Sequence, residues 1–275
     1  MEEMQNQDTP KMSSVEEEEF EMSHTDKLVG VLSEPVPTFT KMAQAEPKTV
    51  DWILPILVFI VVAILSNIVM MSNPEIRLSV IEKQTKNIEQ NFDEMVKKGQ
   101  MTEAQKEEQM ESIRDRMSDQ GMTQYIFTGF GILVVTFIMF FIVSGVFLLI
   151  VKFGLKGDGN YKSAMVSYGL PYYINILQVI VMVILAMVMN KFFSGTSLGA
   201  LTDADGSTIT GWFLNKLDPF TIWFYVIIGI GFAKMFKSND IKKYVFTIVG
   251  VWLLTSLLFF YLAQAVPFLK WFSMS

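Results

Sequence analysis

Five stretches of this sequence contain no Asp, Glu, Lys, Arg or His residue, and they constrain the fold more than any other feature. They are residues 53–71, 125–151, 172–189, 219–233 and 244–269. Four of them have at least 18 residues, and about 20 helical residues cross the hydrocarbon core of a bilayer. Because these stretches lack the polar face of a helix in a soluble protein, we predict an all-α polytopic membrane protein with five transmembrane helices.

The composition of the chain agrees with this class. Hydrophobic residues make up 51% of the sequence and charged residues 18%, whereas soluble domains have about 25% charged residues. The stretch at residues 219–233 is short, and it reaches the length of a span only with Leu217 at one end and Met235–Phe236 at the other. Lys234 would then extend its ammonium group to the membrane surface. The first 50 residues are polar and lack a signal peptide, so the first stretch is expected to stay as a span.

Lysine residues predict the orientation. The loops expected after spans two and four contain seven lysines, which are Lys152, Lys156, Lys162, Lys234, Lys237, Lys242 and Lys243. Three lysines are expected on the opposite side, namely Lys191, Lys216 and Lys270. Because short cytoplasmic loops are enriched in Lys and Arg, we expect a cytoplasmic N-terminus and an extracytoplasmic C-terminus.

The polar N-terminal region divides into two parts before the first span. Residues 1–23 are rich in Glu, Gln and Met and are expected to be a disordered acidic leader. Residues 24–50 mix apolar groups with charges and are expected to be an amphipathic segment at the membrane interface. Pro35 and Pro37 should break this segment into two pieces. Residues 51–72 then form the first span.

The charged insert at residues 73–121 is expected to be an extramembrane helical hairpin. Asn73 can cap the first arm, Gly99 ends it, and Thr102 with Gln105 forms a capping box for the second arm. Apolar residues recur at helical spacing on the arms: Ile81, Ile88, Phe92, Met95, Val96, Met110, Ile113 and Met117. Two interpretations stay open, because the arms can pack on each other or present a docking surface to a partner protein or a second copy of the chain.

Residues 122–275 are expected to form a four-span bundle, and its third span begins with unusually polar sequence, SYGLPYYINILQ. Seven residues are candidates for a ligand or partner groove: Tyr168, Pro171, Tyr172, Tyr173, Asn175, Gln178 and Gln264. The tyrosine hydroxyls are expected at the depth of the interface. Asn175 and Gln178 share a helical face one turn deeper, where they either hydrogen-bond between helices or line a polar groove for a ligand or lipid headgroup.

No motif for catalysis, metal binding or a cofactor is found in the sequence. Residues 154–160 (GLKGDGN) lack the features of a phosphate-binding loop. Residues 203–208 (DADGST) lack the ligand spacing of a calcium loop, and turn chemistry accounts for Asp205. The single histidine, His24, has no neighbouring ligand residues. No charged residue is expected within a span, which argues against an ion-coupled transporter. Nothing indicates nucleic acid as a partner.

Three passages together resemble one known family. They are VGVLSEPVPTFTKMAQAEP followed by DWILPILV, GDGNYKSAMVSYGLPYYI, and LDPFTIWFYVIIGIGFAKMFK. Their order and spacing are similar to those of the Yip (Ypt/Rab-interacting protein) family of membrane proteins, in its bacterial form. The residues that match the family's motifs are Pro37, Phe39, Gly157, Asp218, Phe220, Trp223, Gly229 and Gly231.

The resemblance implies five transmembrane helices and a cytoplasmic N-terminus. Eukaryotic members bind Rab-type GTPases in vesicle traffic, whereas bacterial members have no settled activity, and no catalytic residue comes with the resemblance. We therefore expect a non-enzymatic scaffold in the bacterial inner membrane. It would contact membrane lipids and recruit a partner protein through the hairpin or the N-terminal segment, or organise the membrane. The alternative is a transporter or lipid-translocating protein with a polar groove beside span three.

Overall fold

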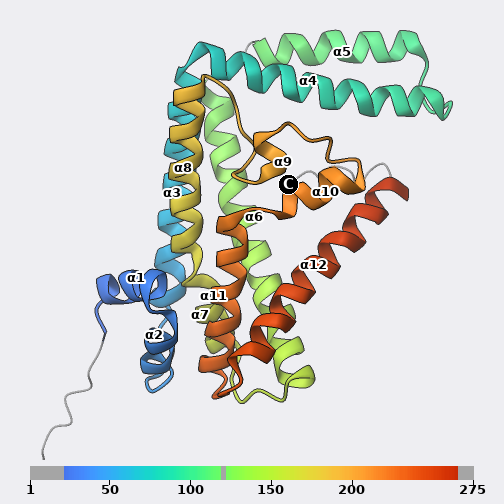
Figure 1. The fold of residues 1–275 in the computed structure, drawn as a ribbon. Coiled ribbons are helices and arrows are strands. Elements are labelled where there is room, and N and C mark those ends of the chain that lie inside the picture. Colours follow the sequence, from blue (N-terminus) through green and yellow to red (C-terminus); the bar gives the residue numbers. More distant parts are fainter. Residues whose placement is uncertain (1–21, 119–121, 266–275) are drawn as a thin grey trace, which may run out of the picture.

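The computed structural model describes residues 22–118 and 122–265, and every regular element in these residues is helical (Figure 1). In chain order the elements are α1 (His24–Ser33), α2 (Pro35–Met42), α3 (Val50–Ser72), α4 (Pro74–Lys97), α5 (Glu103–Ser118), α6 (Met122–Leu149), the π-helix η1 (Ile150–Gly154), α7 (Tyr161–Gly169), α8 (Tyr172–Met189), α9 (Leu198–Leu201), α10 (Ile209–Lys216), α11 (Pro219–Met235) and α12 (Ile241–Ala265). With its apolar helices, the chain is a polytopic all-α membrane protein, as the sequence predicts.

Among the described residues, four helical segments are each long and apolar enough to cross a bilayer: Val50–Ser72, Phe130–Gly154, Tyr161–Met189 and Ile241–Ala265. The remaining apolar stretch differs, because α11 is short and α10 meets it at an angle of 64°. Asp218 caps the start of α11, and Pro219 takes the first helical position, where its missing N–H is tolerated. The described part of the chain therefore has four candidate crossings, or five if α10 and α11 together make one bent crossing.

The N-terminal segment forms two helices that meet at Glu34. Ser23 and Asp26 form a capping box at the start of α1, and Pro35 takes a position in the first turn of α2. Most of the expected acidic leader, residues 1–21, lies outside the described part of the chain.

Helices α1 and α2 are packed against the bundle, with α2 beside α11 (Figure 1). The side chain of Phe39 is fully buried in the main core. The ammonium group of Lys27 forms a buried ion pair with Asp51, at the start of α3, with an N–O distance of 2.6 Å. This segment, which the sequence predicts at the membrane interface, is therefore also attached to the spans by an apolar anchor and a buried ion pair.

The charged insert folds into two helices, α4 and α5, that lie side by side beyond one end of the bundle (Figure 1). The Asn73 side chain accepts hydrogen bonds from the backbone N–H groups of Glu75 and Ile76, at 2.9 and 3.4 Å. Gly99 follows α4 with a φ of 68°, in the left-handed region that favours glycine. The capping box predicted at Thr102 is present at the start of α5.

The two lysine-rich loops lie together at the end of the bundle near α1 and α2, and the hairpin lies at the other end (Figure 1). Lys237, after α11, pairs with Asp158, before α7, at an N–O distance of 3.1 Å. The backbone N–H of Asp158 also donates to the carbonyl of Phe236, at 3.2 Å. These contacts join the loops that the charge pattern places on the same side of the membrane.

Candidate functional site in the third span

The polar residues of the third span reach a buried carboxylate. The side-chain amide of Gln178, in α8, donates hydrogen bonds to Asp218 at 2.8 Å and to Thr196 at 3.1 Å. The hydroxyl of Thr196 lies 2.9 and 3.0 Å from the two carboxylate oxygens of Asp218. Asp218 is 4% exposed and Thr196 is 6% exposed. We refer to Gln178, Thr196 and Asp218 as the polar cluster.

The same carboxylate begins α11. One oxygen of Asp218 accepts hydrogen bonds from the backbone N–H groups of Phe220 and Thr221, at 3.0 and 3.3 Å. A carboxylate at this position is stabilised by the cap bonds and by the positive end of the helix dipole. The buried carboxylate is thus surrounded by donors from two side chains and one helix terminus, as burial of a polar group requires.

The position of Asp218 adds a buried carboxylate beside the third span, which the sequence did not indicate. The chain between α8 and α11 folds back, so that α9 and α10 lie beside the upper half of the bundle (Figure 1). Gln178 is the seventh residue of α8, about 9 Å from the start of that helix at 1.5 Å per residue. Asp218, one residue before α11, therefore lies alongside the apolar helix α8.

The other two amides of the predicted groove are not part of this cluster. Asn175 is half-buried, and within the described residues its side chain makes no hydrogen bond. Gln264 is exposed and donates to the backbone carbonyl of Ser207, at 3.3 Å. Of the three amides, only that of Gln178 connects elements of the bundle around the third span.

The remaining residues of the predicted groove belong to the aromatic core. Tyr168 and Tyr172 are each 8% exposed, and Tyr173 and Pro171 are also buried. The ring of Tyr168 stacks on Phe140 with a centroid distance of 5.6 Å. A further ring, Phe224, meets both Tyr168 and Tyr172 edge to face, at 5.9 and 5.7 Å. Such contacts stabilise helix packing, and they place these rings inside the core.

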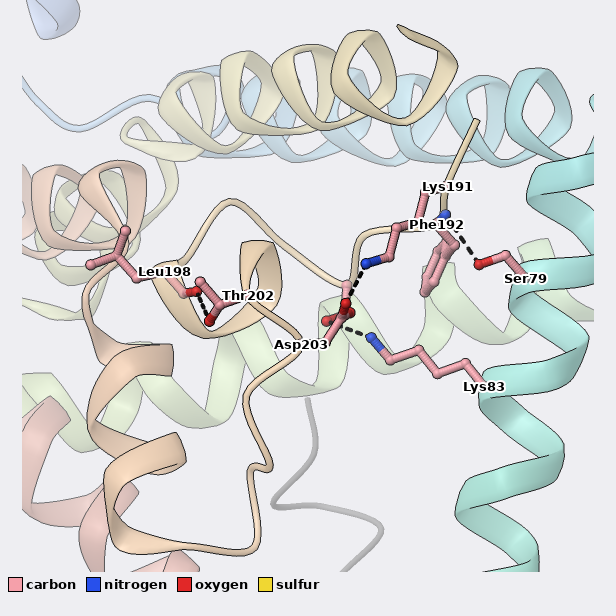
Figure 2. A network of polar contacts seen from close by, with 8 residues as sticks. Ser79, Lys83, Lys191, Phe192, Leu198, Thr202 and Asp203 are labelled. Carbon is pink, nitrogen blue, oxygen red and sulfur yellow. Dashed lines mark hydrogen bonds and ion pairs between the residues drawn. The ribbon is translucent and has the colours of Figure 1, made fainter. Parts of the chain in front are cut away.

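A second polar region joins the hairpin to the loop after α8, and Figure 2 shows this contact. The hydroxyl of Ser79, in α4, accepts a hydrogen bond from the backbone N–H of Phe192, at 3.4 Å. The ammonium group of Lys83 donates to the hydroxyl of Ser194, at 3.4 Å, and lies 5.7 Å from the ring centroid of Phe192. Because more than 100 residues separate the partners, no local sequence pattern indicates these contacts.

One further hydrogen bond strengthens this junction, and an ion pair lies within the loop itself. The side-chain amide of Asn73 donates to the Asn190 side chain at 2.9 Å, and Lys191 pairs with Asp203 across the loop (Figure 2). A small apolar cluster lies beneath them, made of Met70, Ile76, Ala186 and Phe193. The base of the hairpin is therefore held by polar and apolar contacts together.

The polar groups of the hairpin and of the loop before α10 form hydrogen bonds and ion pairs that stabilise the local structure. In the hairpin, a hydrogen bond with Asp93 raises the pKa of Lys106. In the loop before α10, the carboxylate of Asp205 accepts hydrogen bonds from the backbone N–H and hydroxyl of Ser207, at 2.9 and 2.7 Å. These bonds lower the pKa of Asp205. The predicted turn chemistry accounts for this aspartate.

A family model, the Yip1 domain, matches residues 29–263. The chain belongs to the Yip1 family. The match runs from within α1 to near the end of α12, so the N-terminal helices, the hairpin and the bundle all fall within it. Searches of curated proteins and of solved structures gave no significant match. Family membership and the apolar helices together identify an integral membrane protein of the Yip type.

Two of the glycines that carry the family resemblance in the sequence, Gly229 and Gly231, lie where α11 touches other helices. A Cβ atom on Gly229 would lie 2.6 Å from the Cα of Val245, in α12. A Cβ atom on Gly231 would lie 3.0 Å from the ring of Phe39, in α2. Because the first neighbour is backbone, Gly229 permits a close helix contact that a larger residue would disrupt. The buried motif residue Phe39 occupies the space beside Gly231.

The other residues that carry the family resemblance in the sequence also lie at positions that the structure describes. A Cβ atom on Gly157 would lie 2.8 Å from the hydroxyl of Tyr244, so this glycine lets the loop before α7 approach α12. Phe220 and Trp223 are half-buried and pack against the main core. Pro37 is exposed on α2. The motif therefore includes residues at helix contacts and, through Asp218, one member of the polar cluster.

Proposed function

We propose that this Yip-type protein is a non-enzymatic membrane scaffold that recruits a partner protein through its hairpin, α4 and α5. The observation that carries the proposal is that this hairpin is held firmly at its base and exposed beyond it. The 24 residues of α4 span about 36 Å at 1.5 Å per residue. A helical pair of this length can hold a partner at a defined position relative to the membrane.

The far half of the hairpin is supported by the packing of one arm on the other. Met110, in α5, is 5% exposed, and Lys106 pairs with Asp93, in α4. The outer face of α5 carries exposed charged residues, which include Glu107 and Glu111. Met110 of the apolar stripe is therefore used inside the hairpin, and the exposed charged residues of α5 are the surface offered to a partner.

The N-terminal segment is the other partner surface expected from the sequence, and its packing makes it the weaker choice. Lys27 and Phe39 face the bundle and are buried. A partner that needed these side chains would first have to detach α1 and α2 from the spans. The hairpin presents its charged face without such a change.

The polar cluster also favours a scaffold over a transporter. A buried carboxylate beside a span is a feature of ion and substrate pathways. Here, however, the carboxylate of Asp218 accepts hydrogen bonds from Gln178, Thr196 and the first turn of α11. Because its oxygens already accept these hydrogen bonds, the carboxylate links α8 to α11 and stabilises the packing of the bundle.

The same proposal places the protein in a bacterial inner membrane, with a cytoplasmic N-terminus and an extracytoplasmic hairpin. The support for this orientation is the distribution of lysines between loops, seven on the side of the N-terminus against three on the other, and the bacterial membrane is what the resemblance implies. The hairpin's partner would then be an extracytoplasmic protein or the extracytoplasmic part of another membrane protein. A second copy of the chain is included in that class.

Complementation of a deletion strain tests the scaffold. One variant replaces residues 74–118 with a short flexible linker, and another carries Glu107→Lys with Glu111→Lys on the outer face of α5. A third variant, Gln178→Leu, alters the polar cluster and leaves the hairpin intact. We expect the first two to insert at normal levels and fail to complement, and the third to complement. If both hairpin variants complement and Gln178→Leu does not, the transporter or lipid-translocating alternative replaces the scaffold.

A further inference from the structure

A cavity lies at the end of the molecule opposite the hairpin. It has a volume of about 350 Å³ and is lined by Glu46, Pro47, Asn160, Tyr161 and Lys162. The cavity is open at the surface, and four of its five lining residues are exposed. The cavity is formed by two segments that are far apart in sequence, the linker between α2 and α3 and the start of α7. It is separate from the polar cluster and from the hairpin.

The position of these residues along the chain places the cavity at the level of lipid headgroups. Pro47 lies three residues before α3, which is the first candidate span, at Val50–Ser72. Tyr161 is the first residue of the candidate span at Tyr161–Met189. The two walls of the cavity are thus the points where two spans leave the hydrocarbon core. A lipid in the adjacent leaflet would present its headgroup at this depth.

The charges of the cavity have a distinctive arrangement. Glu46 and Lys162 are both exposed, and neither forms an ion pair with a described residue. One cavity therefore offers a carboxylate and an ammonium group that are not joined to each other. The side-chain oxygen of Asn160 already accepts hydrogen bonds from the backbone N–H and the hydroxyl of Ser163, at 2.9 and 3.2 Å. Its amide nitrogen remains as a further donor to a ligand.

We propose that this cavity binds the headgroup of a zwitterionic phospholipid that carries a primary amine, such as phosphatidylethanolamine. The phosphate would contact Lys162 and Asn160, and the ammonium group of the lipid would contact Glu46. An anionic headgroup such as phosphatidylglycerol satisfies the lysine but has no ammonium group to pair with the carboxylate of Glu46. The acyl chains would follow the apolar surface of the spans that begin at the cavity. This site extends the proposed function, because it would keep the scaffold in contact with a particular class of lipid. Lipid binding at this site does not depend on the partner of the hairpin.

Native mass spectrometry of the full-length protein, purified in detergent and titrated with defined lipids, tests the site. We expect the unmodified protein to retain phosphatidylethanolamine in preference to phosphatidylglycerol. Glu46→Lys should reverse the preference, because two lysines then face the phosphate. Lys162→Gln should weaken phosphatidylethanolamine retention about fivefold, the upper range for an exposed ion pair. The matched control is Glu34→Lys, which makes the same charge change at an exposed residue outside the cavity and should keep the original preference.

Three results would overturn the proposal. The first is equal retention of the two lipids by the unmodified protein. The second is the same change in preference for Glu46→Lys and Glu34→Lys, which would mean that only the net charge matters. The third is full competition by water-soluble glycerophosphoethanolamine with no lipid retained, which would identify a site for a soluble phosphate ester. Because the measurement is lipid retention by folded protein, it does not depend on the phenotype that tests the scaffold.

Discussion

The side-chain amide of Gln178 and the carboxylate of Asp218, 40 residues apart in the sequence, are joined by a hydrogen bond of 2.8 Å. This contact brings the third span together with the start of α11. Thr196, from the intervening loop, completes the cluster. The chain between α8 and α11 is therefore attached to the bundle at both ends. It continues from α8 at one end, and at the other the carboxylate of Asp218, which caps α11, binds Gln178.

The two amides on α8 should respond differently to replacement by leucine. Gln178→Leu removes a donor from a buried carboxylate and should lower the free energy of unfolding by about 1 to 3 kcal/mol. Asn175→Leu removes no hydrogen bond to a described residue and should change it little. Thermal unfolding of the purified variants in detergent measures both. Equal losses would show that Asn175 has a structural partner as important as Asp218.

At position 218, asparagine should be tolerated better than leucine. Asn also caps helices and accepts one hydrogen bond from Thr196 or Gln178, whereas Leu removes the cap and leaves buried donors unpaired. We expect Asp218→Leu to destabilise the protein by about 2 to 4 kcal/mol and Asp218→Asn by roughly half of that. The thermal midpoint in detergent is the measurement. A variant with leucine as stable as the one with asparagine would contradict the role of the carboxylate as a cap.

Two glycines in neighbouring helices form a matched pair for testing helix contact. Gly229→Ala would place a Cβ atom 2.6 Å from the backbone of Val245 and should cost about 1 to 3 kcal/mol through overpacking. Gly250, in α12, has no atom within 4 Å of an added Cβ. Gly250→Ala should therefore stabilise the protein by up to about 1 kcal/mol through helix propensity. If both alanine variants unfold at the same temperature, α11 and α12 are not in the close contact described.

Removing one partner of the buried ion pair between Lys27 and Asp51 should destabilise the protein more than replacing both partners. Asp51→Val alone leaves a buried ammonium group without its partner and should destabilise the protein by about 3 to 5 kcal/mol. Replacing both partners, with Lys27→Met and Asp51→Val, should restore much of that loss. Thermal unfolding, together with protease cleavage in the linker at residues 43–49, reports whether α1 and α2 stay attached. A double variant as unstable as the single one would contradict this account.

The orientation can be tested with reporter fusions that end at defined loop residues. A reporter that is active only in the cytoplasm should be active after Lys237 and silent after Ser207. The expectation rests on the lysine asymmetry and on the attachment of the loop at Lys237 to the loop at Asp158. The opposite pattern would invert the proposed topology and place the hairpin in the cytoplasm.

Much of this structure could be predicted from local sequence signals. The apolar stretches predicted the spans, because a helix in lipid has to be apolar over a length that the bilayer sets. Asn73, Gly99 and Thr102 predicted the ends of the hairpin helices, because caps act within one turn. The order of the family motifs predicted membership in the Yip family, which the domain match confirms. Each of these signals is contained in a few consecutive residues or in their spacing.

The tertiary structure alone decided which residues meet. In the sequence, Asp218 was assigned only to the family motif at the start of the fourth span, and the folding back of α9 and α10 brings it to Gln178. The bend of 64° before α11 likewise appears only when the chain is packed. Phe39 and Lys27 looked interfacial and are buried against the spans. The physical reason is that hydropathy indicates only which residues enter the membrane. Contacts between helices depend on side-chain shape and on hydrogen-bond donors and acceptors that lie far apart in the sequence.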